Sequence, residues 1–187
     1  ANIIVDRTKW IDVLMKEEYY KFSCDNVPNW QKNKCKALIN LYNATDGDHW
    51  TRSWGWLYYY DICGWSGVIC SLDSTLDLRN NGLKGSLPPD FYTMVFWRYD
   101  LGENQLGPNL PQNIEKMEWV QVLRLDNNQF RGILPAGLNE LKNLNVLDLS
   151  NNQFTGPLPI LQNVEWNKIR TLKLAGNQFT GRIPGDL

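Results

Sequence analysis

The sequence is poor in the residues that carry acid–base or metal chemistry. It contains a single histidine, His49, among 187 residues. Nucleophilic catalysis needs a base beside a Ser or Cys, and a metal site needs several ligands at fixed spacing, but neither pattern is present. A Gly-rich phosphate loop is also missing. We therefore expect no enzymatic activity, no cofactor and no metal.

An excess of charge and long apolar runs are missing as well. Nineteen basic and twenty acidic residues give a net charge of −1, so the chain lacks the positive surface that general nucleic-acid binding requires. No apolar stretch reaches the roughly 18 residues that crossing a membrane requires. We expect neither nucleic acid as a partner nor membrane insertion within this chain. The sequence also opens without a secretion signal, so we expect that a leader was removed or that the chain belongs to a longer one.

Cysteine is scarce and confined to the first part of the chain. The four cysteines are Cys24, Cys35, Cys63 and Cys70. Their even number favours two disulfides and an oxidising compartment. We predict that Cys24 pairs with Cys35 and that the other two pair with each other. The alternative is a four-cysteine zinc site, which the wide intervals disfavour because such sites usually contain closely spaced pairs.

One glycosylation sequon supports the same compartment. Asn43 is followed by Ala44 and Thr45, which is the acceptor pattern for an N-linked glycan. Together with the predicted disulfides, it indicates a secreted or cell-surface glycoprotein modified at Asn43.

The strongest positive signal is a motif that occurs five times. Each copy has the form Leu-x-Leu-x-x-Asn-x-Leu/Phe, and four of the five continue with Gly-x-Leu/Ile-Pro. The second copy departs from the form, with Tyr99 at a leucine position and Pro108 where glycine is usual. Successive motif asparagines are 23, 24, 24 and 25 residues apart, namely Asn81, Asn104, Asn128, Asn152 and Asn177. Such a period is typical of a stacked solenoid.

Each copy predicts one rung of that solenoid. The two leucines of Leu-x-Leu point into the core from a short strand, and stacked rungs form a parallel sheet. The asparagine amide is expected to bond backbone groups of its own and the neighbouring rung. Phe130, Phe154 and Phe179 should stack in the core of the last three rungs. The Gly-x-Leu/Ile-Pro segment predicts a second turn, with the proline ending any strand ladder.

The residues before the repeats predict a covering structure. Residues 6–22 carry an apolar stripe at helical spacing, made of Ile11, Leu14, Met15, Tyr19 and Phe22. A second helix is expected over about residues 30–42, followed by an irregular aromatic segment. We predict residues 1–71 as an N-terminal cap and residues 72–187 as five repeats of the same solenoid domain, without a C-terminal cap.

The repeats resemble those of leucine-rich repeat proteins, specifically the subclass found in plant receptor ectodomains. Residues 144–159 (LNVLDLSNNQFTGPLP) match its signature closely, and residues 37–56 resemble its cap helix and loop. Residues 63–70 have the form Cys-x-Trp-x-Gly-Val-x-Cys, in which the family's two cysteines pair. The resemblance implies an α/β solenoid with a parallel sheet on its concave face and a helical, disulfide-bonded N-terminal cap.

The candidate ligand-binding residues are the charged side chains that the strands present on the concave face. They are Asp77, Arg79, Asp100, Glu103, Arg124, Asp126, Asp148 and Lys173. The alternative is that opposite charges on neighbouring rungs neutralise one another and only keep the sheet soluble. Tyr58, Tyr59 and Tyr60 form a second candidate contact in the cap, because three consecutive side chains cannot all point inward.

The sequence thus predicts an extracellular, non-enzymatic module for recognition or adhesion, with a protein or glycan ligand. A structural surface or fibril protein is the main alternative. It would self-associate head-to-tail, with the helix of residues 6–22 covering a neighbour's uncapped end. Inhibition of a secreted hydrolase is a weaker alternative, implied by the family resemblance.

Overall fold

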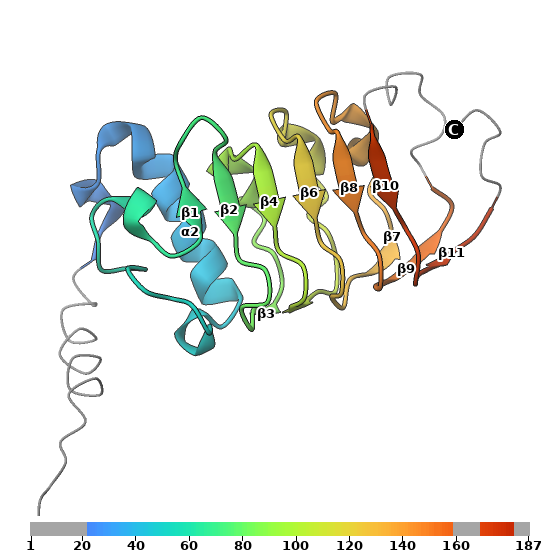
Figure 1. Ribbon diagram of the computed structural model, residues 1–187, viewed down its shortest axis with the longest axis horizontal. Coiled ribbons are helices and arrows are strands. Elements are labelled where there is room, and N and C mark those ends of the chain that lie inside the picture. Colours follow the sequence, from blue (N-terminus) through green and yellow to red (C-terminus); the bar gives the residue numbers. More distant parts are fainter. Residues whose placement is uncertain (1–21, 159–168, 182–187) are drawn as a thin grey trace, which may run out of the picture.

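The computed structural model describes residues 22–158 and 169–181, and Figure 1 shows them as a stack of strands with one helix at its N-terminal end. The main sheet has six strands in the order β1-β2-β4-β6-β8-β10. Their bounds are β1 (Val68–Ile69), β2 (Thr75–Asp77), β4 (Arg98–Asp100), β6 (Val122–Arg124), β8 (Val146–Asp148) and β10 (Thr171–Lys173). The helix of residues 6–22 was predicted for a segment that, apart from Phe22, lies outside the described residues.

The register of the main sheet follows the repeat. The strands from β2 to β10 run parallel, and the first core residue of each repeat pairs with its equivalent in the next. These core residues are Leu76, Tyr99, Leu123, Leu147 and Leu172. The short strand β1 pairs antiparallel with β2 and so covers the first edge of the parallel sheet. The α/β solenoid predicted from the sequence is therefore confirmed.

The prediction of a plain turn after each asparagine was incomplete. Short strands form there, namely β3 (Lys84–Gly85), β5 (Gln105–Leu106), β7 (Arg131–Ile133), β9 (Gln153–Gly156) and β11 (Gln178–Phe179). They make two small parallel sheets, β3-β5 and β11-β9-β7. The division falls at Pro108, which replaces the glycine of other repeats and has no N–H to continue a ladder. Only a C=O remains there, and it accepts the N–H of Arg131 at 2.7 Å.

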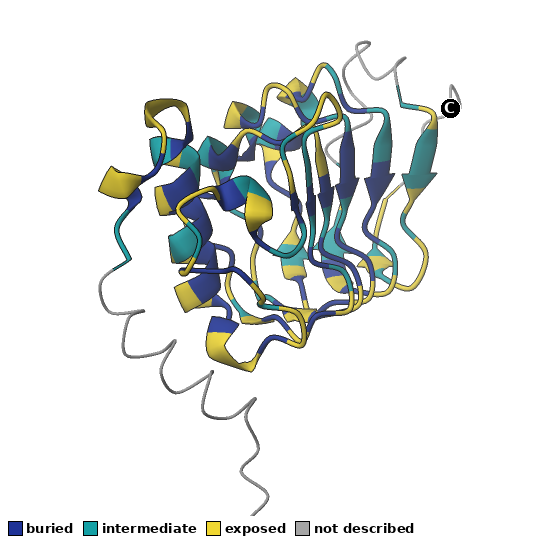
Figure 2. Cartoon of the chain, turned by 60° about the vertical axis from the view of Figure 1, so that its left-hand side comes forward, coloured by how far each residue is buried: buried dark blue, intermediate teal, exposed yellow. Residues whose placement is uncertain are grey.

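Short 3₁₀ turns connect these strands behind the main sheet. Those in the repeats are η5 (Phe91–Met94), η6 (Ile114–Lys116) and η7 (Ala136–Glu140). In the N-terminal part, η1 (Cys24–Asn26) and η2 (Asn29–Gln31) precede α2 (Lys32–Ala44), and η3 (Gly47–His49) and η4 (Ile62–Gly64) follow it. The helix predicted over residues 30–42 is present, although its first turn is the 3₁₀ turn η2. Figure 2 shows buried residues in the main-sheet strands from β2 to β8 and on one side of the helix, with exposed residues in the surrounding loops.

The motif asparagines from Asn104 to Asn177 bond the backbone as predicted, and Asn128 illustrates the arrangement. Its amide nitrogen donates to the carbonyl groups of Leu125 and Asp126 in its own rung and of Leu101 in the preceding rung, at 3.0–3.1 Å. Its amide oxygen accepts the N–H of Leu106 at 2.9 Å. Each such side chain satisfies backbone groups that the bend removes from the sheet, so the polar amide can remain buried. Asn81 differs, because its side chain bonds the N–H and the carbonyl of Arg52 in the cap.

The core is continuous from the cap into the repeats. The rings of Phe130, Phe154 and Phe179 stack with centroids 6.0 and 6.1 Å apart, which confirms the predicted aromatic column. In the cap, the ring centroid of Trp56 lies 4.8 Å from that of Trp50 and 4.9 Å from that of Trp65. The indole N–H of Trp56 donates to the carbonyl of Ser66. These large side chains cover the end of the stack and satisfy their polar groups.

The predicted disulfide pairs are both present. Cys24 is bonded to Cys35, and Cys63 is bonded to Cys70. The zinc alternative is therefore wrong, because all four sulfurs are engaged with each other. In the part of the chain that the structure describes, no group of three or more His, Cys, Asp or Glu side chains is arranged for a metal ion. No helix among these residues is long and apolar enough to cross a membrane.

Candidate functional site

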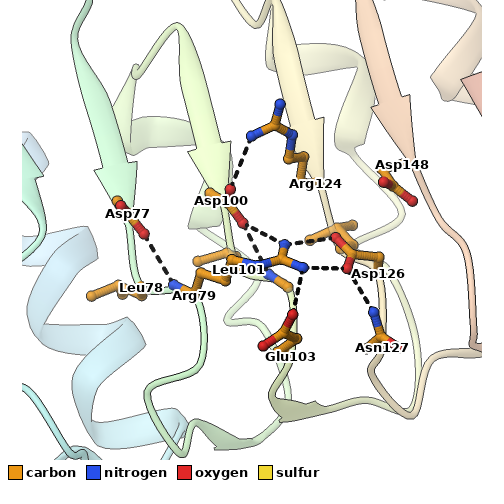
Figure 3. A network of polar contacts seen from close by, with 12 residues as sticks. Asp77, Leu78, Arg79, Asp100, Leu101, Glu103, Arg124, Asp126, Asn127 and Asp148 are labelled. Atoms are coloured by element: carbon orange, nitrogen blue, oxygen red, sulfur yellow. Dashed lines mark hydrogen bonds and ion pairs between the residues drawn. The ribbon is translucent and has the colours of Figure 1, made fainter. Parts of the chain in front are cut away.

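The concave face presents two columns of outward side chains, because alternate residues of a strand point away from the core. One column ends the strands and contains Asp77, Asp100, Arg124, Asp148 and Lys173. The second lies two residues further along each rung and contains Arg79, Gly102, Asp126, Ser150 and Ala175. Figure 3 shows how the first three rungs bring part of these columns together.

Arg79 is the centre of the resulting network. Its Nη1 donates to Asp126 Oδ1 at 2.9 Å and to Asp100 Oδ1 at 3.1 Å. Its Nη2 donates to Asp126 Oδ2 at 2.7 Å and to Glu103 Oε1 at 2.9 Å. The contact with Asp126 is a bidentate pair, the strongest geometry for a guanidinium and a carboxylate. These four bonds occupy the donors of both terminal nitrogens, so Arg79 is already committed within the chain.

Gly102 makes this network possible. Arg79 belongs to the first repeat and Asp126 to the third, so the guanidinium must pass over the second repeat at the position of Gly102. A Cβ atom built there would overlap Arg79 Nη1 and lie 2.6 Å from Asp126 Oδ1. A side chain at this position would therefore displace the ion pair. The absence of a side chain at Gly102 leaves the space that the Arg79 guanidinium occupies.

The network sets the charge state of Asp126, whose side chain is only 5% exposed. Burial alone would raise the pKa of Asp126, but hydrogen bonds from Arg79 and Asn127 outweigh it and lower that pKa below its ordinary value. The hydrogen bond to Asp126 is in turn the main cause that raises the pKa of Arg79. Both groups are charged at neutral pH, as a buried pair must be to offset its loss of hydration.

Glu103 adds to this network from an uncommon backbone conformation. Its φ is 54°, in the left-handed region. The equivalent positions of the other rungs have the same conformation but carry residues that tolerate it, namely Asn80, Asn127, Asn151 and Gly176. Glutamate is the exception, and its carboxylate meets Arg79.

Of the remaining predicted residues, Arg124 joins the Arg79 network through Asp100, and Lys173 forms a separate pair with Asp148. Arg124 Nη1 lies 3.2 Å from Asp100 Oδ2, and Lys173 Nζ lies 3.3 Å from Asp148 Oδ2. Asp77 accepts the backbone N–H of Arg79 at 3.2 Å. Neighbouring charges of the first column thus pair in part, as the solubility alternative expected. The network centred on Arg79 crosses between the columns, and the sequence analysis did not predict it.

Two further arginines of this face were also missed. Arg52, from the loop after α2, donates through Nη2 to the carbonyl of Arg79 at 2.7 Å. Arg98 begins β4 at an outward, exposed position and has no ion-pair partner among residues 22–158 and 169–181. Its signal in the sequence was the position two residues before Asp100, which alternation places on the same face.

The other predicted sites have simple surroundings. Of the three consecutive tyrosines, Tyr59 packs against the core, whereas Tyr58 and Tyr60 are exposed. Asn43 is exposed near the end of α2. His49 is exposed and its Nδ1 lies 2.7 Å from Asp46 Oδ1. No nucleophile paired with this histidine is found in the described part of the chain.

Comparisons with known proteins agree with this architecture. The family model described as Leucine Rich Repeat matches residues 74–94, 119–141, 143–163 and 168–187. The chain is a leucine-rich repeat protein. No curated protein matches the sequence of this leucine-rich repeat protein at a significant level.

Several solved structures resemble this leucine-rich repeat protein over most of their length. The ectodomain of the receptor kinase SOBIR1 from Arabidopsis thaliana is 26% identical, with a TM-score of 0.68, over 84% of this chain and 85% of that chain. The BIR2 ectodomain from the same plant is 27% identical, with a TM-score of 0.72, over 81% and 83%. A chain of the Arabidopsis BIR3–SERK2 complex is 27% identical, with a TM-score of 0.68, over 81% and 85%. The fold is that of plant receptor ectodomains, which supports the predicted extracellular setting.

Proposed function

We propose that this leucine-rich repeat protein is an extracellular, non-enzymatic recognition module that binds a protein ligand through its concave face. The observation that carries this proposal is the likeness to receptor ectodomains over more than 80% of both chains. One of these matches comes from a complex between two proteins, BIR3 and SERK2. Head-to-tail assembly, adhesion, glycan binding and hydrolase inhibition stay predictions from the sequence alone.

The hydrogen bonds within the concave face indicate which of its arginines are available to a ligand. Arg79 has committed the donors of both terminal nitrogens to the chain's own carboxylates, so it has little to offer a ligand. Arg124 donates only through Nη1 to Asp100, and its side chain is 40% exposed. The remaining N–H groups of Arg124 point to no acceptor among the described residues.

Arg98 lies beside Arg124 on the same face. It stands on β4 in register with Val122, which precedes Arg124 by two residues on the neighbouring strand. Parallel strands are about 4.8 Å apart, so the two outward arginines are diagonal neighbours. Two adjacent guanidinium groups with unused donors suit a carboxylate or another anionic group. We infer that the protein ligand presents an acidic group to Arg98 and Arg124.

A capture experiment with matched variants tests this proposal. The double variant Arg98→Glu/Arg124→Glu, the wild-type chain and the control Arg131→Glu/Lys142→Glu serve as baits in extracellular extract from the source organism. The control makes the same charge change at exposed residues away from the concave face. We expect one protein to be recovered with wild type and control, and to be reduced about tenfold or more with the concave-face variant. Equal recovery with all three baits would contradict the proposed site.

A further inference from the structure

A third cation with unused hydrogen-bond donors lies near Arg98 and Arg124. Lys34, in the first turn of α2, is half-buried, and its Nζ lies 4.1 Å from the centre of the Phe96 ring and 3.5 Å from Ser74 Oγ. Burial lowers the pKa of the Lys34 amine. No carboxylate in the described part of the chain pairs with this amine to offset its burial. A carboxylate brought by a ligand would supply the missing counter-charge.

Backbone pairing places Lys34 beside the start of β4. The N–H groups of Trp97 and Arg98 both donate to the carbonyl of Ser74, at 2.9 and 3.2 Å. Ser74 is the residue that Lys34 reaches, and the Phe96 ring under its ammonium group belongs to the residue before Trp97. The chain thus passes from the surroundings of Lys34 through Trp97 to Arg98 on the concave face.

Trp97 and Val95 add apolar surface beside these cations. Their side chains are 38% and 48% exposed. Val95 has a φ of 49°, in the left-handed region, which is unfavourable for a β-branched residue. Folding gains little from a strained residue whose side chain stays half in water, so the pair suits a contact with another molecule. Tryptophan and arginine are also the residues that contribute most often to binding energy in protein interfaces.

We propose that the protein ligand contacts this face with an extended segment whose acidic groups meet Lys34 and the two arginines and whose apolar side chain packs on Trp97. The inference rests on the proposed function, because it takes Arg98 and Arg124 as one end of the contact. From Ser74 to the midpoint of the two arginines is about one and a half strand spacings across the sheet and two residues along it, or roughly 10 Å. An extended chain covers that distance in about three residues. The segment therefore carries acidic residues about two to four positions apart, beside an apolar residue.

Trp119 lies outside this contact although it is 59% exposed. The charged groups of the hollow that it borders are three carboxylates and one ammonium group, namely those of Glu115, Glu118, Glu140 and Lys142. Such surroundings repel an acidic segment. Trp119 is therefore a matched control for Trp97. Lys36 is the control for Lys34, because it is exposed and two residues further along α2, on another side of the helix.

The test begins with random short peptides displayed on phage. Peptides that bind the wild-type chain are kept only if they are lost on Arg98→Ala/Arg124→Ala, and the tightest of them is synthesised with a fluorescent label. Its affinity for each chain is measured by fluorescence anisotropy. We expect Lys34→Ala and Trp97→Ser each to weaken binding about fivefold or more. Lys36→Ala and Trp119→Ser should bind within about twofold of wild type.

Substitutions in the peptide show which acidic group meets which cation, whatever the chain variants do to folding. Each acidic residue of the peptide is changed in turn to the corresponding amide, and the loss of affinity is compared between wild type and the variants. One amide peptide should bind wild type and Lys34→Ala equally. Another should bind wild type and Arg98→Ala/Arg124→Ala equally, because its lost carboxylate was the partner of the arginines.

The two proposals fail in different ways. Peptides that need the arginines but bind Lys34→Ala and Trp97→Ser as tightly as wild type would overturn this inference and leave the proposed arginine site standing. Selection that yields no peptide sensitive to Arg98→Ala/Arg124→Ala would contradict the arginine site and this inference together.

Discussion

Arg79 in the first repeat holds both carboxylate oxygens of Asp126 in the third, at 2.9 and 2.7 Å. The pair skips the intervening repeat and ties three rungs together through side chains. Removing Arg79 would leave the buried carboxylate of Asp126 without its counterpart, which typically costs several kcal/mol. We therefore interpret the Arg79 network as a structural clamp on the concave face, which meets the surface that we propose for recognition at Asp100.

Replacing Gly102 with Ala should break this clamp. The new methyl group would occupy the space of Arg79 Nη1 and force the guanidinium away from Asp126. We expect the free energy of unfolding in urea to fall by about 1–3 kcal/mol. Gly64→Ala is the control, since a Cβ there meets its nearest neighbour at 3.5 Å. A Gly102→Ala chain as stable as the control would show that the clamp adds nothing.

The clamp should also make stability depend on pH. The folded-state pKa of Asp126 lies below the ordinary value of an aspartate, about 3.9, so the stabilisation by its charge is fully present above that value. It is lost as pH falls through the lowered folded-state pKa. We expect the difference in unfolding free energy between wild type and Asp126→Asn to be constant near neutral pH. It should shrink below about pH 4, as measured by urea unfolding at a series of pH values. A difference that persists to pH 2 would contradict this charge assignment.

Glu103 balances an ion pair against backbone strain. Asn tolerates a φ of 54° better than Glu or Ala, and the strain is worth about 1 kcal/mol or more. The pair with Arg79 is half-exposed at Glu103 and contributes about 0–1 kcal/mol. We expect Glu103→Asn to unfold at nearly the wild-type temperature and Glu103→Ala to unfold up to about 4 °C lower. The reverse order would show that the backbone at Glu103 stores no strain.

Glycosylation of Asn43 stays a prediction that a mass measurement checks. Asn43 is exposed, whereas Thr45 of the same sequon is buried and donates through Oγ1 to the carbonyl of Leu41 at 2.7 Å. Expression through a eukaryotic secretory pathway should add one glycan mass, which glycosidase treatment and Asn43→Gln both remove. Asn43→Gln should leave stability almost unchanged. An unmodified wild-type chain would show that the sequon is not used.

The sequence predicted the features that depend on the repeat itself. The spacing of Asn104, Asn128 and Asn152 predicted the rungs, because each side-chain amide bonds the backbone of its own rung and of a neighbouring rung. The stacked phenylalanines and both disulfides followed from positions read along the chain. Each of these contacts joins either equivalent positions of neighbouring repeats or residues close in sequence. Such contacts can be predicted from a single sequence.

The Arg79 network could not be found in the same way. Aligning the repeats predicts contacts between residues at the same position in neighbouring rungs. Arg79 instead passes over Gly102 in the second repeat and bonds Asp126 in the third. The small strands after the asparagines were missed for a related reason. Two or three paired residues leave no alternation to detect, and their pairing depends on the stacking of the rungs.

The most direct test of this account is the affinity of the captured protein for two variants of the chain. We expect Arg98→Ala/Arg124→Ala to weaken binding about tenfold or more while the free energy of unfolding changes by less than about 1 kcal/mol. Arg79→Ala should do the opposite, lowering stability by about 2–3 kcal/mol and leaving the affinity of the folded chain within about threefold of wild type. Wild-type affinity in the Arg98→Ala/Arg124→Ala variant would contradict the division of the concave face into a clamp and a recognition surface.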